Sequence, residues 1–184
     1  MGTADVQLAA DRLVKKLEEL AIPYAICGGL AVSAHGHQRT TVDVDVVVTA
    51  DGLSRFKAAA LGLGWLERFA GSRGVRDTEH RTSIDFLLTG GSPADRAATG
   101  VTFPDPARCA VRIEGKQYID LPHLIEMKLA SGMTAPDRPR DFDDVIQLIR
   151  AAALPETFAA QLHADVRAKY RELWGYAQRP KGEF

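Results

Sequence analysis

Apolar residues recur along the chain with two periods, and these predict where helices and strands lie. The helical spacing across 6–20 predicts an amphipathic helix that ends before Pro23. A β-branched run at 42–48 predicts a strand, and shorter apolar runs predict further strands at 24–27, 65–69 and 81–88. The pair Gly28-Gly29 predicts a turn into a short helix at 30–34, and another helix is expected at 53–61.

The other segments complete an α+β order. We expect a turn at 71–76, an irregular surface loop at 94–108 and a hairpin at 111–119. From 121 onward the pattern is helical in three pieces, at 122–133, 140–153 and 156–177, separated by Pro136, Pro139 and Pro155. The predicted fold is α+β, a mixed β-sheet packed by helices with a C-terminal helical segment. The expected domains are an α/β core at 1–120, which includes the N-terminal helix, and a helical segment at 121–184 packed on it.

Two charges interrupt the valine-rich segment TVDVDVVV. Because side chains alternate between the faces of a strand, Asp43 and Asp45 point the same way, about 6–7 Å apart at the backbone. Two carboxylates so placed repel each other and lose hydration, and a divalent cation relieves both costs. An edge strand with one wet face is the alternative explanation.

Neighbouring residues favour the metal interpretation. Asp85 interrupts another apolar strand, where an unpaired charge is costly. Gly28 and Gly29 form a strand–glycine–helix junction, whose backbone N–H groups suit phosphate. Three carboxylates behind a phosphate cradle are the elements of a two-metal phosphoryl-transfer site, and their oxygen ligands suit Mg²⁺ or Mn²⁺.

These motifs, in this order, resemble the nucleotidyltransferase superfamily. The string GGLAVSAHGHQRTTVDVDVVV is similar to a bacterial subset near the AbiEii-type toxin nucleotidyltransferases, although several relatives carry Gly-Ser in place of Gly28-Gly29. The back half resembles that subset's lysine motif, at 120–128 with Lys128, and its arginine–aspartate helix motif, at 140–144. The resemblance therefore implies a nucleotidyltransferase-like mixed sheet.

The resemblance also implies an activity: transfer of an NMP from an NTP to an acceptor hydroxyl, on RNA, tRNA or protein, with two Mg²⁺ (or Mn²⁺) ions. A toxin–antitoxin context, with a cognate antitoxin or other protein partner, is implied as well. The resemblance implies that Gly28 and Gly29 hold the triphosphate, and that Asp43, Asp45 and Asp85 bind metal. It implies that Asp85 also helps to activate the hydroxyl and that Lys128 contacts phosphate. Asp141 or Asp144 would hold Lys128 or the acceptor. The alternative is a non-catalytic interaction or antitoxin-like module of the same fold.

Several of these residues have simpler interpretations. Arg39 and Thr41 could reach phosphate, but an arginine before a strand is often only a solvated flank. Lys128 lies either on an outer helix face or in a cleft. Asp141, Asp143 and Asp144 also suit a helix N-terminus. His35 and His37 lack further zinc ligands at a useful spacing, so a helix end or packing role is favoured over a metal pair.

Two other enzyme classes also use the DxD motif. Haloacid-dehalogenase-type phosphatases place a loop after it, whereas this strand continues through Val48, and metal-dependent glycosyltransferases have larger domains. The formal net charge of -1 gives no global field that would attract nucleic acid. Cys27 and Cys109 are expected to be buried free thiols. We find no signal peptide or membrane-length apolar run, so a cytoplasmic protein without membrane contact is expected.

Overall fold

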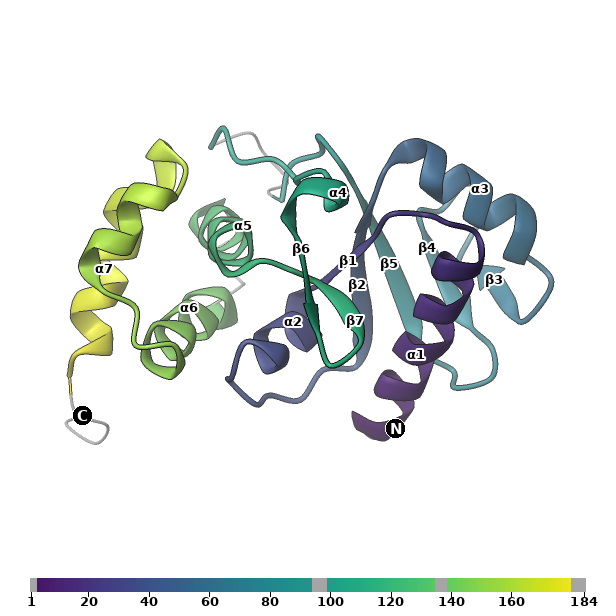
Figure 1. Cartoon of the computed structure of the whole chain (residues 1–184), viewed down its shortest axis with the longest axis horizontal. Helices are drawn as coiled ribbons and strands as arrows, with labels where there is room; N and C mark the ends of the chain where they lie inside the picture. Colours follow the sequence, from purple (N-terminus) through teal and green to yellow (C-terminus); the bar gives the residue numbers. More distant parts are fainter. Residues whose placement is uncertain (1–2, 94–98, 135–138, 180–184) are drawn as a thin grey trace. The chain divides into compact units, whose positions relative to one another are not determined.

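The computed structural model describes residues 3–93, 99–134 and 139–179 (Figure 1). The chain forms two compact units. The first comprises Met1–Ala31, Arg39–Gly91 and Phe103–Asp120, and the second comprises Val32–Gln38, Ser92–Thr102 and Leu121–Phe184. In the described part of the chain, no helix has both the length and the apolar character needed to cross a bilayer.

The first unit is built on a seven-stranded mixed sheet with the order β3-β4-β5-β2-β1-β7-β6. β1 is antiparallel to β2, β2 is parallel to β5, and β1 is parallel to β7. The outer strands pair antiparallel, β3 with β4, β4 with β5, and β6 with β7. The predicted mixed sheet is thus confirmed. The strands are β1 (Ala25–Cys27), β2 (Asp43–Val48), β3 (Trp65–Glu67), β4 (Gly74–Asp77), β5 (Ser83–Leu88), β6 (Ala110–Ile113) and β7 (Lys116–Ile119).

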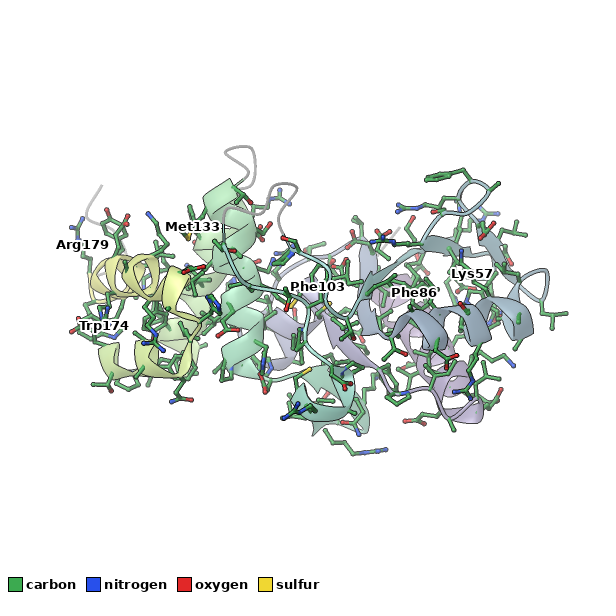
Figure 2. All side chains as sticks on the ribbon, turned by 90° about the horizontal axis from the view of Figure 1, so that it is seen from above. Lys57, Phe86, Phe103, Met133, Trp174 and Arg179 are labelled. Atoms are coloured by element: carbon green, nitrogen blue, oxygen red, sulfur yellow. The ribbon has the colours of Figure 1, made fainter. Side chains whose placement is uncertain are left out.

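Helices α1 (Thr3–Glu19) and α3 (Ala50–Ala60) cover one face of this sheet. The ring of Phe56 on α3 lies 5.0 Å from that of Phe86 on β5, which is 2% exposed inside the unit (Figure 2). From α1, Arg12 stacks over Trp65 and pairs with the fully buried Asp77. The packing of these two helices therefore buries the face of the sheet opposite the aspartates.

Two sequence predictions for this unit were wrong. The glycine- and arginine-rich segment 71–76 was expected to be a turn, but its second half belongs to β4. β4 lies between β3 and β5 and buries Val75 completely, so strand pairing outweighs the local glycine signal. The loop expected at 94–108 contains a short helix, α4 (Pro106–Cys109), which Asp105 caps by accepting from the Ala107 N–H. Residues 94–98 of that loop lie outside the described residues.

The second unit is helical. It contains α5 (Leu121–Thr134), α6 (Pro139–Ala151), two short 3₁₀ segments and α7 (Arg167–Ala177). The single helix expected at 156–177 is wrong, because the 3₁₀ segments Glu156–Gln161 and Ala164–Val166 interrupt it. The break lets the chain fold back, so that the Phe158 ring lies 5.7 Å from the Tyr170 ring. The linker residue Pro136 lies outside the described residues.

Candidate active site

Three aspartates from two neighbouring strands meet on the face of the sheet opposite α1 and α3. β2 and β5 are in register, so Asp45 lies directly beside Asp85, and Asp43 precedes Asp45 by two residues on the same face. Each offers a carboxylate oxygen, and these oxygens all lie within 4.8 Å of one another. Within the ranges that the structure describes, this is the one group of three or more such side chains that could hold a metal ion.

The surroundings of the three carboxylates fit a divalent cation. Behind them, on the other face of the same strands, Val44, Val46 and Ile84 are completely buried. The half-buried carboxylates therefore repel one another against an apolar layer, which strengthens the repulsion. Hard oxygen donors at this spacing are the ligands that Mg²⁺ and Mn²⁺ prefer.

A glycine at the end of β1 makes room for one of these carboxylates. Cys27 is the antiparallel partner of Asp45, and the chain then turns into α2 (Gly28–Ala34). Gly28 has a φ of 60°, and a Cβ at this position would overlap the Asp45 carboxylate. Both its backbone conformation and the adjacent acidic side chain therefore require glycine.

The next glycine borders two more of the predicted site residues. A Cβ at Gly29 would lie 2.8 Å from Thr41 Oγ1 and 3.4 Å from Arg39 Nε. Thr41 is buried, and its hydroxyl donates to Asp43 Oδ1 over 2.9 Å. Thr41 therefore fixes the orientation of Asp43, while Arg39 places a positive charge beside the start of α2.

The structure adds a residue that sequence reasoning missed. Arg68, just after β3, donates from Nη2 to Asp85 Oδ1 and forms an ion pair with it. Gly74 on β4 is the antiparallel partner of Asp85. No local signal in the sequence points to Arg68, because its approach to Asp85 depends on β4 lying between β3 and β5.

The remaining predicted site residues form a cluster of their own in the second unit. Lys128 Nζ on α5 lies 2.7 Å from Asp141 Oδ1 and 2.8 Å from Asp144 Oδ2, both on α6. All three side chains are largely buried. Burial acts to lower the pKa of the Lys128 ammonium, but the charges of the two carboxylates and their hydrogen bonds outweigh it and raise that pKa.

Histidine and cysteine provide no second metal site among the described residues. The group of three or more metal-capable side chains found there contains neither His35 nor His37. Cys27 and Cys109 are buried free cysteines, as predicted. Burial raises the pKa of the Cys109 thiol to about 12, so it is protonated and unreactive near neutral pH.

No family model matches the chain, and no curated protein matches it in sequence. Solved structures do match it. A crystal structure of the aminoglycoside nucleotidyltransferase ANT(2'')-Ia in complex with adenylyl-2''-tobramycin has a TM-score of 0.58 at 18% identity, and covers 92% of this chain and 98% of that one. The solution structure of the antibiotic-resistance factor ANT(2'')-Ia has a TM-score of 0.60 at 17% identity, with 96% of each chain covered.

JHP933 from Helicobacter pylori is a further structural neighbour, with a TM-score of 0.53 at 15% identity, covering 96% of this chain and 90% of that one. These likenesses extend over nearly the whole chain, although identity is low. They do not support the narrower resemblance to AbiEii-type toxins. The chain therefore has a nucleotidyltransferase-like fold, a mixed sheet packed by helices.

Proposed function

We propose that this chain transfers a nucleotide from an NTP to an acceptor hydroxyl with the help of divalent cations. The observation that supports this most is the convergence of Asp43, Asp45 and Asp85 within 4.8 Å on a nucleotidyltransferase-like fold. These three aspartates would hold two Mg²⁺ or Mn²⁺ ions. When bound, such ions neutralise the charge of the phosphates and of the departing pyrophosphate.

The chain's own residues would hold the reactants in place. The acceptor oxygen would bond to the α-phosphorus while the bond to the pyrophosphate oxygen breaks, and Asp85 would take the hydroxyl proton. Gly28 and Gly29 would leave the backbone at the start of α2 open to the triphosphate. Thr41 keeps Asp43 oriented, and Arg39, beside Gly29, would contact phosphate. Positioning and charge neutralisation supply most of the acceleration in such reactions.

In this proposal, the cluster of Lys128, Asp141 and Asp144 in the second unit positions a positive charge. An ammonium group has three N–H donors, and Asp141 and Asp144 account for two of them in the described contacts. The two carboxylates thus hold the Lys128 ammonium at one place on α5. Its third donor would serve a phosphate oxygen of the nucleotide.

Two arginines beside the triad could contact an anionic acceptor such as an RNA end. Arg76 on β4 is exposed and pairs with Ser83, two residues before Asp85, so its side chain shares the aspartates' face of the sheet. Arg68 adds a second positive charge there. RNA phosphates would complement these two guanidinium groups once metal ions balance the charge of the three carboxylates. The proposal also includes a protein hydroxyl as the acceptor, and a toxin–antitoxin context in which a cognate antitoxin binds the chain.

The direct test offers each labelled NTP with Mg²⁺ to short RNA 3′ ends, to a protein mixture and to aminoglycosides. We expect label transfer by the native chain, and a loss of at least about 100-fold in Asp45→Asn or Asp85→Asn. Asp51→Asn is the matched control, because it removes the same charge from an exposed aspartate on α3. It should transfer label at the native rate.

A chain that transfers no label and binds no nucleotide in a metal-dependent way would contradict the proposal. The non-catalytic interaction module would then be the better explanation. Mutating the three aspartates would in that case leave partner binding intact, which a pull-down with the product of an adjacent gene would measure.

A further inference from the structure

The guanidinium of Arg68 engages a member of the aspartate triad. Arg68 follows the last residue of β3, and its side chain is 44% exposed. It reaches across β4 to Oδ1 of Asp85, a residue that the proposed function assigns to a metal ion. A positive charge from a segment outside the two aspartate strands thus binds one of the three carboxylates.

The absence of a side chain at Gly74 leaves room for the Arg68 guanidinium to reach Asp85. A Cβ on Gly74 would lie 2.6 Å from Arg68 Nε, 2.7 Å from its Nη2 and 2.8 Å from Asp85 Oδ1. Any larger residue would therefore occupy the space in which the ion pair forms. The same strand carries the exposed Arg76 on the aspartates' face, and no carboxylate contact of Arg76 is found among the described residues.

We propose that Arg68 is a mobile counter-ion: it occupies Asp85 while the metal is absent, competes with the metal for that carboxylate, and moves to the triphosphate when metal and nucleotide bind. This inference rests on the proposed function. Three carboxylates within 4.8 Å repel one another, and one guanidinium charge relieves part of that repulsion. A divalent cation relieves more of it, and so displaces the guanidinium.

The chemistry of arginine suits the second half of this exchange. The planar guanidinium donates two parallel hydrogen bonds, which match a phosphate as well as a carboxylate. An exposed ion pair is weak, so it breaks easily when a better partner for Asp85 arrives. Arg68 is therefore expected to oppose metal binding in the empty site and to favour nucleotide binding in the loaded one. A surface ion pair of purely structural role would not favour nucleotide binding.

The first measurement is Mn²⁺ binding to the whole chain without nucleotide, followed by electron paramagnetic resonance. Arg68→Gln should bind Mn²⁺ about two- to fivefold more tightly than the native chain, the range expected for removal of an exposed ion pair. Arg76→Gln is the matched control, since it removes the same charge from the same face without freeing a carboxylate. The change in Mn²⁺ affinity caused by Arg76→Gln should be at least about twofold smaller than the change caused by Arg68→Gln.

The second measurement is binding of a non-hydrolysable ATP analogue in saturating Mn²⁺. Arg68→Gln should bind it about tenfold more weakly, and Arg68→Lys should lie between this variant and the native chain because it keeps the charge but not the planar fork. Gly74→Ala should reproduce the weaker nucleotide binding of Arg68→Gln, since its methyl group takes the space of the guanidinium; Mn²⁺ affinity is compared only between the arginine variants, because this methyl group would also lie 2.8 Å from Asp85 Oδ1. Circular dichroism checks that each variant is folded. If Gly74→Ala does not fold, the result for Arg68→Gln alone tests the inference.

Equal Mn²⁺ affinity in Arg68→Gln and Arg76→Gln would overturn this inference while leaving the proposed function intact. Unchanged nucleotide affinity in Arg68→Gln would also overturn it. Absence of Mn²⁺ binding in the native chain and in every variant would instead overturn the proposed function, and the role of Arg68 with it.

Discussion

At Gly28, backbone conformation and side-chain volume impose the same requirement. The φ of 60° is costly for any residue with a Cβ, and the Asp45 carboxylate fills the place where that Cβ would be. Two independent reasons for glycine thus coincide beside one of the proposed metal ligands. This coincidence gives the position a measurable signature.

We predict that Gly28→Ala displaces the Asp45 carboxylate and weakens Mn²⁺ binding at least about tenfold, in addition to a backbone cost of about 1–2 kcal/mol. Gly62→Ala isolates the backbone cost, because Gly62 has a φ of 81° and nothing within 4 Å of its Cβ position. Urea denaturation and Mn²⁺ titration measure the two effects. Equal Mn²⁺ affinity in the two variants would show that Asp45 does not need the space at Gly28.

Local rules go far toward locating the three aspartates. Strand alternation gives the common face of Asp43 and Asp45, and a charge inside an apolar strand singles out Asp85. Arg68 and Gly74 could not be found in this way. Their approach to Asp85 depends on the order of β3, β4 and β5 in the sheet, and strand order is not encoded in any one segment.

At the scale of elements, the contact between α5 and α6 encloses one largely buried charge. Lys128 is held between Asp141 and Asp144, and removing it takes away the cation that these two largely buried carboxylates share. Breaking such a pair from one side costs more than the pair itself contributes, because the remaining charge stays desolvated. The cluster is therefore structural, whether or not Lys128 also contacts nucleotide.

We predict that Lys128→Met lowers the free energy of unfolding by about 3–5 kcal/mol. Adding Asp141→Asn and Asp144→Asn to this variant should recover most of the loss, since the two carboxylate charges that Lys128 balances are then removed as well. Lys169→Met, which breaks an exposed pair with Glu172, should cost less than about 1 kcal/mol in the same urea titration. If Lys128→Met kept native stability but lost nucleotide affinity, the cluster would serve only the ligand.

The 3₁₀ break in the tail shows where helical periodicity stops being informative. Phe158, Leu162, Val166 and Tyr170 recur every four residues, and all four are buried, so the pattern identified the apolar positions correctly. It could not reveal that the chain turns back between them. Arg167 stabilises this turn by donating to the carbonyls of Leu162 and Ala160, contacts that a continuous helix would not form.

The folded-back tail predicts a large effect for one truncation. Phe158→Ala removes a ring that is 8% exposed and lies 5.7 Å from the Tyr170 ring, and should lower the free energy of unfolding by about 3–5 kcal/mol. Tyr176→Ala truncates a ring that is 41% exposed, and should cost less than half as much. Thermal and urea unfolding followed by circular dichroism would compare the two. A smaller loss in Phe158→Ala than in Tyr176→Ala would argue that the tail does not fold back in solution.

For the molecule as a whole, the resolved pKa shifts nearly all point the same way. Burial raises the pKa of Tyr24 and of Cys109 in the first unit to about 12, and of Tyr170 in the second unit also to about 12. The pKa of Glu67 alone among the resolved groups is lowered, because its carboxylate accepts a hydrogen bond from Lys57. Both units therefore favour the protonated forms of their buried groups.

This common direction predicts that alkali destabilises the chain. Above pH 9 for Cys109 and pH 10 for the tyrosines, the unfolded chain releases protons that the folded chain retains until about pH 12. The free energy of unfolding should therefore lose the contribution of these groups progressively between pH 9 and 12, and urea titrations across that range would measure it. Tyr170→Phe removes one such group along with its hydrogen bond to the Pro155 carbonyl. It should lower stability at neutral pH yet make the decline above pH 10 shallower. A decline equally steep in Tyr170→Phe and the native chain would show that Tyr170 does not retain its proton in the folded state.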